Sequence, residues 1–312
     1  MIYVYHSIDD VPDFGEMNVT LTMGFFDGVH VGHRSILEQV GAYCQTGVQA
    51  AGLVTFDRHP SELLAPEKAP KLLTTLNEKL ALLREFKLSY ILVIPFEKKI
   101  STMYAKQFVE EVLVDKLKVT QMIVGYDTRF GREGAGDSKL LEEMGKRWNF
   151  KTKTVEAVKF GSKPVSSTSI RALLDQGDVK TAEQMLGRPY ALGGKVVKGI
   201  GIGKKIGIPT ANIQADPRKL IPRDGIYAAW CVTPEGRWKA AVNIGMRPTI
   251  PLENPSRTIE AHLIDFNGDL YGSEATLEFV RFVRPERKFE NMKYLVEQIH
   301  KDVGIVKNLL TN

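Results

Sequence analysis

The stretch "GFFDGVHVGH", residues 24–33, decides how the first half of this 312-residue chain is organised. It follows "NVTLTM" (18–23), where apolar and polar residues alternate as they do in a β-strand. It leads into "HRSILEQVGAYC" (33–44), where apolar side chains recur at helical spacing. Its glycines allow a tight turn and a close approach of a ligand to the backbone. The stretch is therefore predicted to be a strand-to-helix turn.

Such a turn in a parallel α/β sheet is a favoured position for a phosphate group, because the free N–H groups of the next helix attract anions. His30 and His33 lie three residues apart, on one side of the first helical turn. Two imidazoles there can donate hydrogen bonds to phosphate oxygens. A plain surface turn and a metal-binding pair are the alternatives, and no further cluster of ligand residues supports a metal. The pattern favours phosphate chemistry.

The rest of the first half repeats the alternation of strands and helices. The sequence "TTLNEKLALLREF" (74–86) starts with a capping box formed by Thr75 and Glu78. This alternation predicts an α/β domain over residues 1–186, with a doubly wound parallel sheet that binds ligands beyond its C-terminal strand ends. Further strands are expected at 48–56, 90–96, 121–127 and 152–158, and further helices at 107–117 and 138–148.

After "LGRPYALGG" (186–194) the pattern changes to short strands separated by Gly, Pro, Asn and Asp. One helical stretch, 291–310, closes the chain. Residues 187–312 are therefore predicted to form an antiparallel β-barrel with a C-terminal helix. The candidate strands are 194–200, 208–213, 225–233, 237–245, 258–266 and 275–283.

The composition excludes several classes of protein. Cys44 and Cys231 lack a CxxC spacing, so neither a disulfide framework nor a zinc site is expected. The N-terminus turns acidic before an apolar segment develops, and no run reaches membrane-spanning length, which favours a cytoplasmic protein without a membrane partner. The sequence has no basic run with interleaved aromatic residues, so no nucleic-acid partner is expected. A net charge of +5 suits an anionic substrate but does not require one. The oligomeric state is not determined by the sequence.

A second string, "VSSTSIRALL" (165–174), also points to phosphate. It places Ser166, Ser167 and Thr168 at the start of a predicted helix, with Arg171 one turn further on. An N-cap needs only one such hydroxyl. Three hydroxylated residues, free backbone N–H groups and a guanidinium together are typical of a polyphosphate clamp.

These two strings resemble those of the HxGH nucleotidyltransferases. The HxGH string alone is shared by many transferases, but the ordered set across both halves is specific. From about residue 18 to about residue 302, the chain resembles the bacterial bifunctional riboflavin kinase/FMN adenylyltransferases (FAD synthetases). The other strings that carry the resemblance are "TFDRHP", "GYDTRFG", "LGRPY", "GIPTANI", "NIGMRPT" and "EAHLIDF".

For the first half, the resemblance implies adenylylation of FMN by ATP, giving FAD and pyrophosphate. His30 and His33 are then expected to contact the ATP phosphates, and Arg171 to hold the departing pyrophosphate. The resemblance implies further ATP contacts from Gly24, Phe26, Asp27, Gly28, Ser167 and Thr168, and flavin contacts from Phe56, Asp127 and Phe130.

In the second half, "GIGIGKKIGIPTANI" (199–213) resembles the phosphate loop of riboflavin kinases. Thr210 and Asn212 lie two residues apart, so they share a face of an extended chain. Their neutral oxygens suit Mg²⁺ that arrives with ATP, because the ion then relies on phosphate charge. Gly203, Lys204 and Lys205 are expected to cover the ATP phosphates. A simple hairpin turn is the alternative.

The strand "TIEAHLIDF" (258–266) places Glu260 and His262 on the face opposite Ile259 and Ala261. The resemblance assigns to Glu260 the general base that takes the proton from the riboflavin 5′-hydroxyl as this oxygen attacks the γ-phosphate of ATP. For His262, a packed barrel histidine is favoured over a catalytic one.

The resulting hypothesis is a two-step enzyme that uses Mg²⁺ and ATP to convert riboflavin to FMN and then FMN to FAD. A chain that retains only one activity is an alternative. A flavin- or nucleotide-binding regulator without catalysis is another, although binding alone has no need of a general base such as Glu260.

Overall fold

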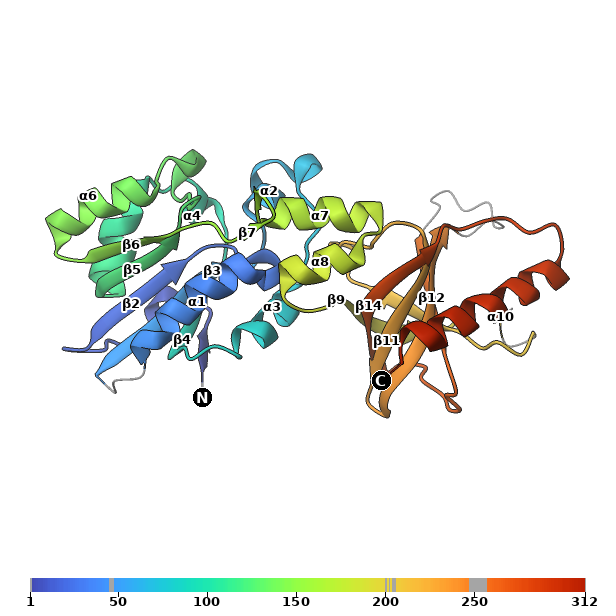
Figure 1. The fold of residues 1–312 in the computed structure, drawn as a ribbon. Helices are drawn as coiled ribbons and strands as arrows, with labels where there is room; N and C mark the ends of the chain where they lie inside the picture. The colour runs from blue at the N-terminus through green and yellow to red at the C-terminus, as the bar shows by residue number, and fades with distance from the viewer. Residues whose placement is uncertain are drawn as a thin grey trace. The chain divides into compact units, whose positions relative to one another are not determined.

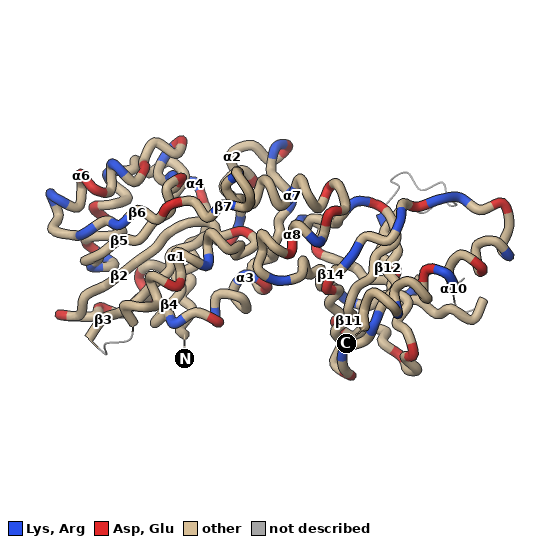
Figure 2. The backbone as a smooth tube through the Cα atoms, in the orientation of Figure 1, with Lys and Arg blue, Asp and Glu red and all other residues tan. Residues whose placement is uncertain are grey.

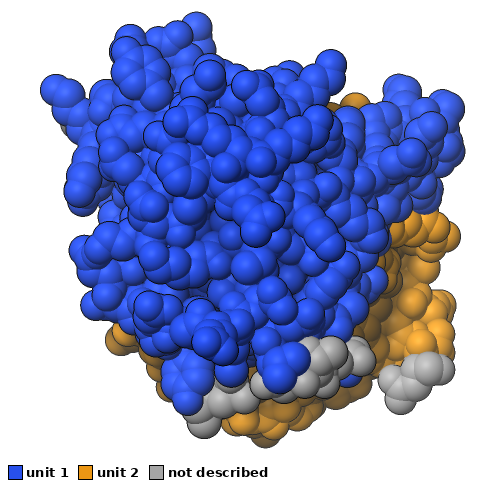
Figure 3. Space-filling model, turned by 90° about the vertical axis from the view of Figure 1, so that its left-hand side faces the viewer, with its two compact units in different colours: residues 1–167 blue, residues 168–312 orange. Residues whose placement is uncertain are grey.

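The computed structural model describes residues 2–44, 48–199, 201, 203, 206–246 and 257–311. Lys204 and Lys205, which were expected to cover the ATP phosphates, lie outside the described residues. The chain divides into two compact units, Met1–Ser167 and Thr168–Asn312 (Figure 3).

The first unit contains a parallel sheet with the strand order β1-β4-β3-β2-β5-β6 (Figure 1). From β2 the chain continues through β3 and β4 towards one edge of the sheet. On the other side of β2, β5 is followed by β6 at the opposite edge, so the strand order reverses between β2 and β5. Doubly wound sheets bind their ligands at the C-terminal ends of the strands at such a reversal. The strands are β1 Tyr3–Tyr5, β2 Asn18–Met23, β3 Gln49–Phe56, β4 Tyr90–Ile94, β5 Val119–Gly125 and β6 Lys151–Val155.

Helices cover both faces of this sheet, which explains why its strands are almost continuously apolar. Val54 of β3 belongs to a core cluster with residues of α6 and the π-helix, whereas the preceding residue, Leu53, packs in a cluster with residues of α1 and α3. The helices are α1 Val31–Tyr43, α2 Pro60–Leu64, α3 Leu76–Leu83, α4 Lys98–Ser101, α5 Ala105–Gln107, the π-helix Phe108–Lys116 and α6 Ser138–Trp148.

The sequence predictions for this unit are confirmed in type, with local differences. The expected helix 107–117 is largely π-helical, and near its end Leu117 N donates to Val112 O over 3.0 Å. Periodicity marks the buried face but does not reveal this wider turn. The three-residue β1 and the hairpin of β7 Lys159–Phe160 and β8 Lys163–Pro164 were not predicted, since both are too short for a visible pattern.

The second unit contains a closed antiparallel barrel followed by α10 Met292–Leu309, as expected, and the order of its strands is β10-β13-β12-β11-β14-β9. Val306 of α10 is fully buried and packs in one cluster with Ala228 of β11 and Ile264. The strands are β9 Tyr190–Val197, β10 Ala211–Ala215, β11 Gly225–Thr233, β12 Gly236–Met246, β13 Arg257–Leu263 and β14 Glu274–Arg284.

Two helices precede the barrel, α7 Ser167–Gln176 and α8 Val179–Leu186. Arg223 N, which lies just before β11, donates to Leu174 O over 3.0 Å, and α8 contacts β9 and β14. By contacts these helices therefore group with the barrel, whereas the sequence placed the boundary after Leu186. The boundary after Leu186 stays a prediction.

A comparison of two fragments tests where the second unit begins. A fragment of residues 187–312 lacks α8, whose Val179, Ala182 and Met185 are buried. Exposing the apolar surface that α8 covers should make it less stable than a fragment of residues 168–312, by about 2 kcal/mol or more. Urea unfolding followed by circular dichroism measures the difference. Equal midpoints and slopes would show that α7 and α8 are not part of the folding unit.

Candidate active sites

The turn between β2 and α1 has an unusual backbone. Phe26, Gly28 and Val29 have positive φ angles of 55°, 79° and 41°. Glycine adopts this conformation without strain, but for a β-branched residue such as Val29 it costs about 1–3 kcal/mol. Val29 is fully buried, so packing holds it in this conformation. Strain of this kind is often found at functional sites.

Asp27 fixes this turn from the side. Asp27 is 3% exposed, and its carboxylate accepts hydrogen bonds of 3.0 Å from the backbone N–H groups of Leu73 and Thr74. The Thr74 hydroxyl accepts from Gly28 N over 3.0 Å. Asp27 was predicted to bind ATP; its side chain binds the segment before α3, and so shapes the turn on which a phosphate would rest.

The two histidines lie together at the start of α1. His30 is the N-cap residue, and its Nδ1 accepts a hydrogen bond of 3.3 Å from His33 N. This bond leaves the proton of a neutral His30 ring on Nε2. The rings stack with centroids 3.6 Å apart, and Phe26 lies 4.9 Å from the ring of His33.

His33 is held in its neutral form. Burial of the ring, together with the charges of His30 and Lys79, lowers the pKa of His33 well below its usual value. Its Nδ1 is buried and has no hydrogen-bond partner among the described residues. Buried polar atoms are normally paired, so this nitrogen is consistent with a site that a ligand completes.

The start of the second string lies beside this turn. The Ser167 hydroxyl donates to the carbonyl oxygen of Asp27 over 3.0 Å. A Cβ on Gly32 would lie 3.9 Å from the carbonyl oxygen of Val165. The structure therefore brings the start of the second string, up to Ser167, beside the first. Thr168 and Arg171 belong to the second unit, and their part in this site stays a prediction.

The residues predicted to bind flavin have different surroundings. Phe56 ends β3, is half-buried and meets Phe96 edge to face at 5.3 Å. Asp127 is exposed just after β5, the strand next to β2. Phe130 is buried in the core and packs against Phe108 at 6.1 Å. Of the two aromatic residues, Phe56 has the more accessible ring.

Sequence reasoning missed Lys79, a lysine of α3 that is 2% exposed. Its Nζ donates over 3.0 Å to the carbonyl oxygens of Phe25 and Phe56 and to the hydroxyl of Thr55. A signal was present, because Lys79 lies three residues after Leu76 and four before Leu83, on the apolar face of the helix.

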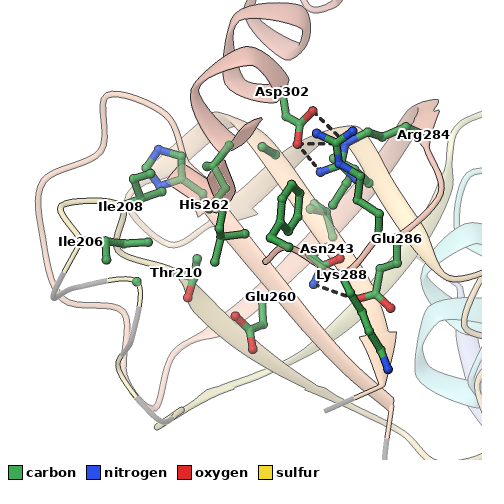
Figure 4. A pocket seen from close by; sticks show the side chains of 18 of the residues that line it. Ile206, Ile208, Thr210, Asn243, Glu260, His262, Arg284, Glu286, Lys288 and Asp302 are labelled. Atoms are coloured by element: carbon green, nitrogen blue, oxygen red, sulfur yellow. Dashed lines mark hydrogen bonds and ion pairs between the residues drawn. The ribbon is translucent and has the colours of Figure 1, made fainter. Parts of the chain in front are cut away.

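The second unit has a cavity of about 1070 Å³, lined by residues of β12, β13 and α10 and of the segments before β10 and after β14 (Figure 4). Thr210 and Glu260 project into it. Glu260 pairs across the strands with Asn212 of β10 and Asn243 of β12. The barrel register therefore aligns three of the polar residues in one row.

The alternation predicted for β13 is confirmed. Ile259 and Ala261 are buried, while Glu260 and His262 are half-buried and line the cavity. His262 Nδ1 lies 2.8 Å from the carbonyl oxygen of Pro209. His262 therefore lies on the same face of β13 as Glu260, as the alternation predicts, and its role as a packed rather than a catalytic histidine stays a prediction.

An ion pair joins the barrel to α10 at one side of the cavity. Arg284 of β14 and Asp302 of α10 approach to 2.6 Å, and Gln298 donates to the same carboxylate over 2.8 Å.

Asn243 of β12 also lines the cavity. Its Nδ2 donates to Glu286 over 3.4 Å, but its Oδ1 is buried without a partner among the described residues. Asn243 was also missed, although it lies in the quoted string "NIGMRPT".

The expected phosphate loop and metal ligands are only partly described. A Cβ on Gly203 would lie 2.4 Å from the carbonyl oxygen of Ile208, so this close turn requires glycine. Thr210 lines the cavity, and Asn212 is buried beside Gly199. The described residues contain no group of three or more His, Cys, Asp and Glu side chains that could hold a metal. A neutral hydroxyl and amide fit Mg²⁺ only when phosphates supply the charge.

None of the described helices has the length and apolar character needed to cross a membrane.

Comparisons with known proteins assign each half of the chain to a family. Residues 15–169 match the FAD synthetase family and residues 186–310 the riboflavin kinase family. A bifunctional riboflavin kinase/FMN adenylyltransferase of Buchnera aphidicola is 35% identical over 294 residues and covers 93% of both chains. The Escherichia coli K12 protein of the same description is 34% identical over 298 residues, 95% of this chain and 93% of its own.

A crystal structure described as a macrolide-efflux protein from Streptococcus pneumoniae has a TM-score of 0.87, covering 98% of this chain and 99% of its own. At 22% sequence identity it shows a shared fold alone. Because the two family models match both halves and relatives 34% and 35% identical align over almost the whole length, the chain belongs to the bifunctional riboflavin kinase/FMN adenylyltransferases.

Proposed function

We propose that this chain phosphorylates riboflavin at the barrel cavity and adenylylates the resulting FMN at the turn after β2. The observation that carries the proposal is that each unit has its own polar site. His30 caps α1 in the first unit with His33 stacked beside it, and a carboxylate faces a large cavity in the second. A cytoplasmic location is part of the proposal.

In the adenylyl transfer, a phosphate oxygen of FMN attacks the α-phosphorus of ATP and pyrophosphate leaves. His30 donates its Nε2–H to a phosphate oxygen, since its Nδ1 already accepts the bond from His33 N. His33, which burial keeps neutral, acts as a second donor, and the N-terminus of α1 adds backbone N–H groups. These fixed dipoles stabilise charge that develops in the transition state. Ser167, Thr168 and Arg171 hold the departing pyrophosphate.

In the phosphoryl transfer, the 5′-hydroxyl of riboflavin attacks the γ-phosphorus of ATP and ADP leaves. Glu260 accepts the hydroxyl proton, and its position beside Thr210 supports this role. Mg²⁺ bound with ATP supplies charge neutralisation at the phosphates. Thr210 and Asn212 contribute neutral oxygens to that ion, and Gly203 allows the close turn of the loop above them.

His30→Ala and His33→Ala should each lower kcat for FAD formation from FMN by about 10²–10³-fold, because each removes a preorganised donor. Riboflavin phosphorylation by the same protein should be unchanged and serves as the internal control. Chromatography of the flavin products measures both rates. Wild-type FAD formation by the double variant would contradict the assignment.

Glu260→Gln should lower kcat for FMN formation by about 10²–10⁴-fold, because the amide cannot accept the proton. FAD formation from supplied FMN should persist. Glu274→Gln, at an exposed glutamate of β14, is the matched control and should leave both rates unchanged. A Glu260→Gln protein with wild-type kinase activity would exclude Glu260 as the base.

The lowered pKa of His33 predicts a pH-dependent stability. The ordinary pKa of a histidine is 6.5. Below this pH, His33 binds a proton in the unfolded chain but not in the folded one. Stability should therefore fall as the pH drops from 6.5 towards the lowered pKa, by up to about 1.4 kcal/mol per pH unit.

Chemical unfolding of the first unit at several pH values measures this effect. His33→Gln should show a flatter profile over this range, whereas a variant of an exposed histidine, His6→Gln, should behave as the wild type. Parallel profiles for His33→Gln and the wild type would show that His33 is not held neutral in the fold.

A further inference from the structure

Lys79 is a buried cation in the first unit. It lies on α3, whose start is fixed by the capping box of Thr75 and Glu78. The residue is 2% exposed, and burial lowers its pKa to about 8 despite the nearby charges of Asp27 and Asp57. Burying a lysine is costly, and apolar residues of similar volume often replace buried charges without loss of stability. Stability alone is therefore a weak explanation for this residue.

The contacts of Lys79 join two separate turns. Its Nζ donates to Phe25 O in the turn after β2, and to Phe56 O and Thr55 Oγ1 at the end of β3, each over 3.0 Å. The Thr55 hydroxyl in turn donates to Phe25 O over 3.2 Å. An ammonium group has three N–H donors, and these three acceptors use all of them. The ring of Phe25 lies 4.2 Å from Nζ and adds a cation–π contact.

The two turns have different tasks in the proposed adenylyl transfer. The first contains His30 and leads into α1, where the ATP phosphates would bind. The second begins at Phe56, the half-buried aromatic residue at the expected flavin side. The attacking oxygen belongs to FMN and the phosphorus to ATP, so the rate depends on the relative position of these two turns.

We propose that Lys79 is a positioning residue for adenylyl transfer, whose ammonium fixes the phosphate turn and the flavin turn at the spacing that the reaction needs. This inference rests on the proposed function of the first unit. Lys79 acts through the backbone carbonyls of Phe25 and Phe56. A compact ammonium suits three converging acceptors better than the planar guanidinium of arginine.

The test is steady-state kinetics of full-length Lys79→Met, which keeps the length of the side chain and removes the donors. We expect kcat for FAD formation to fall by about 10- to 100-fold, because displacing the reacting groups by about 1 Å lowers a reaction rate by about this factor. We also expect the KM for FMN to rise by about fivefold. Riboflavin phosphorylation by the same molecules should stay at the wild-type rate.

Leu83→Ala is the matched control, because Leu83 is fully buried on the same helix and packs in the apolar core. It should lower Tm but leave the KM for FMN unchanged, and its kcat per folded molecule should equal that of the wild type. The inference is overturned if Lys79→Met keeps the wild-type kcat and the wild-type KM for FMN, whether or not its Tm falls.

If Lys79→Met does not fold, Thr55→Val tests the same link with a substitution of similar shape. It removes one acceptor of Lys79 and the bond to Phe25, so the KM for FMN should rise about twofold or more. An unchanged KM and kcat in this variant would also overturn the inference. Failure of the proposed function gives a different result, since FAD formation would then survive the double substitution of His30 and His33.

Discussion

The carboxylate of Asp27 accepts hydrogen bonds from the backbone of Leu73 and Thr74, and the first site depends on this interaction. A buried carboxylate is costly unless its oxygens are paired, so it fixes the segment before α3 against the turn after β2. This attachment supports the positive φ angles of Phe26 and Val29. Those angles in turn deliver the chain to His30 at the start of α1. The same attachment places Lys79 beside Phe25.

Under the proposed function, the two sites bind phosphate in different ways. In the first, a helix N-terminus and the imidazoles of His30 and His33 would provide donors whose positions are set by a strained turn. In the second, Glu260 lies on a strand whose register aligns it with Asn212 and Asn243, and the cavity before it is bounded by α10. Neutral donors suit stabilisation of transferred phosphoryl charge, whereas a carboxylate suits the removal of a proton.

Figure 2 shows Lys and Arg interspersed with Asp and Glu along the backbone of both units, and the net charge of the chain is +5. The proposed recognition of ATP depends on a few oriented groups. Some of these are uncharged, such as His33, which burial keeps neutral, and Thr210.

The sequence by itself determined the two fold types, the turn at 24–33, the capping box at Thr75 and the outward face of Glu260, because hydrophobic period, glycine positions and capping residues are local properties. It could not determine that Asp27 binds a neighbouring segment, that His262 lies against the carbonyl oxygen of Pro209 or that Lys79 joins two turns. These depend on contacts between segments far apart along the chain, where burial and strand register decide which acceptor a polar side chain meets. The tertiary structure alone decided them, since a buried polar group must find its partner wherever the fold brings one.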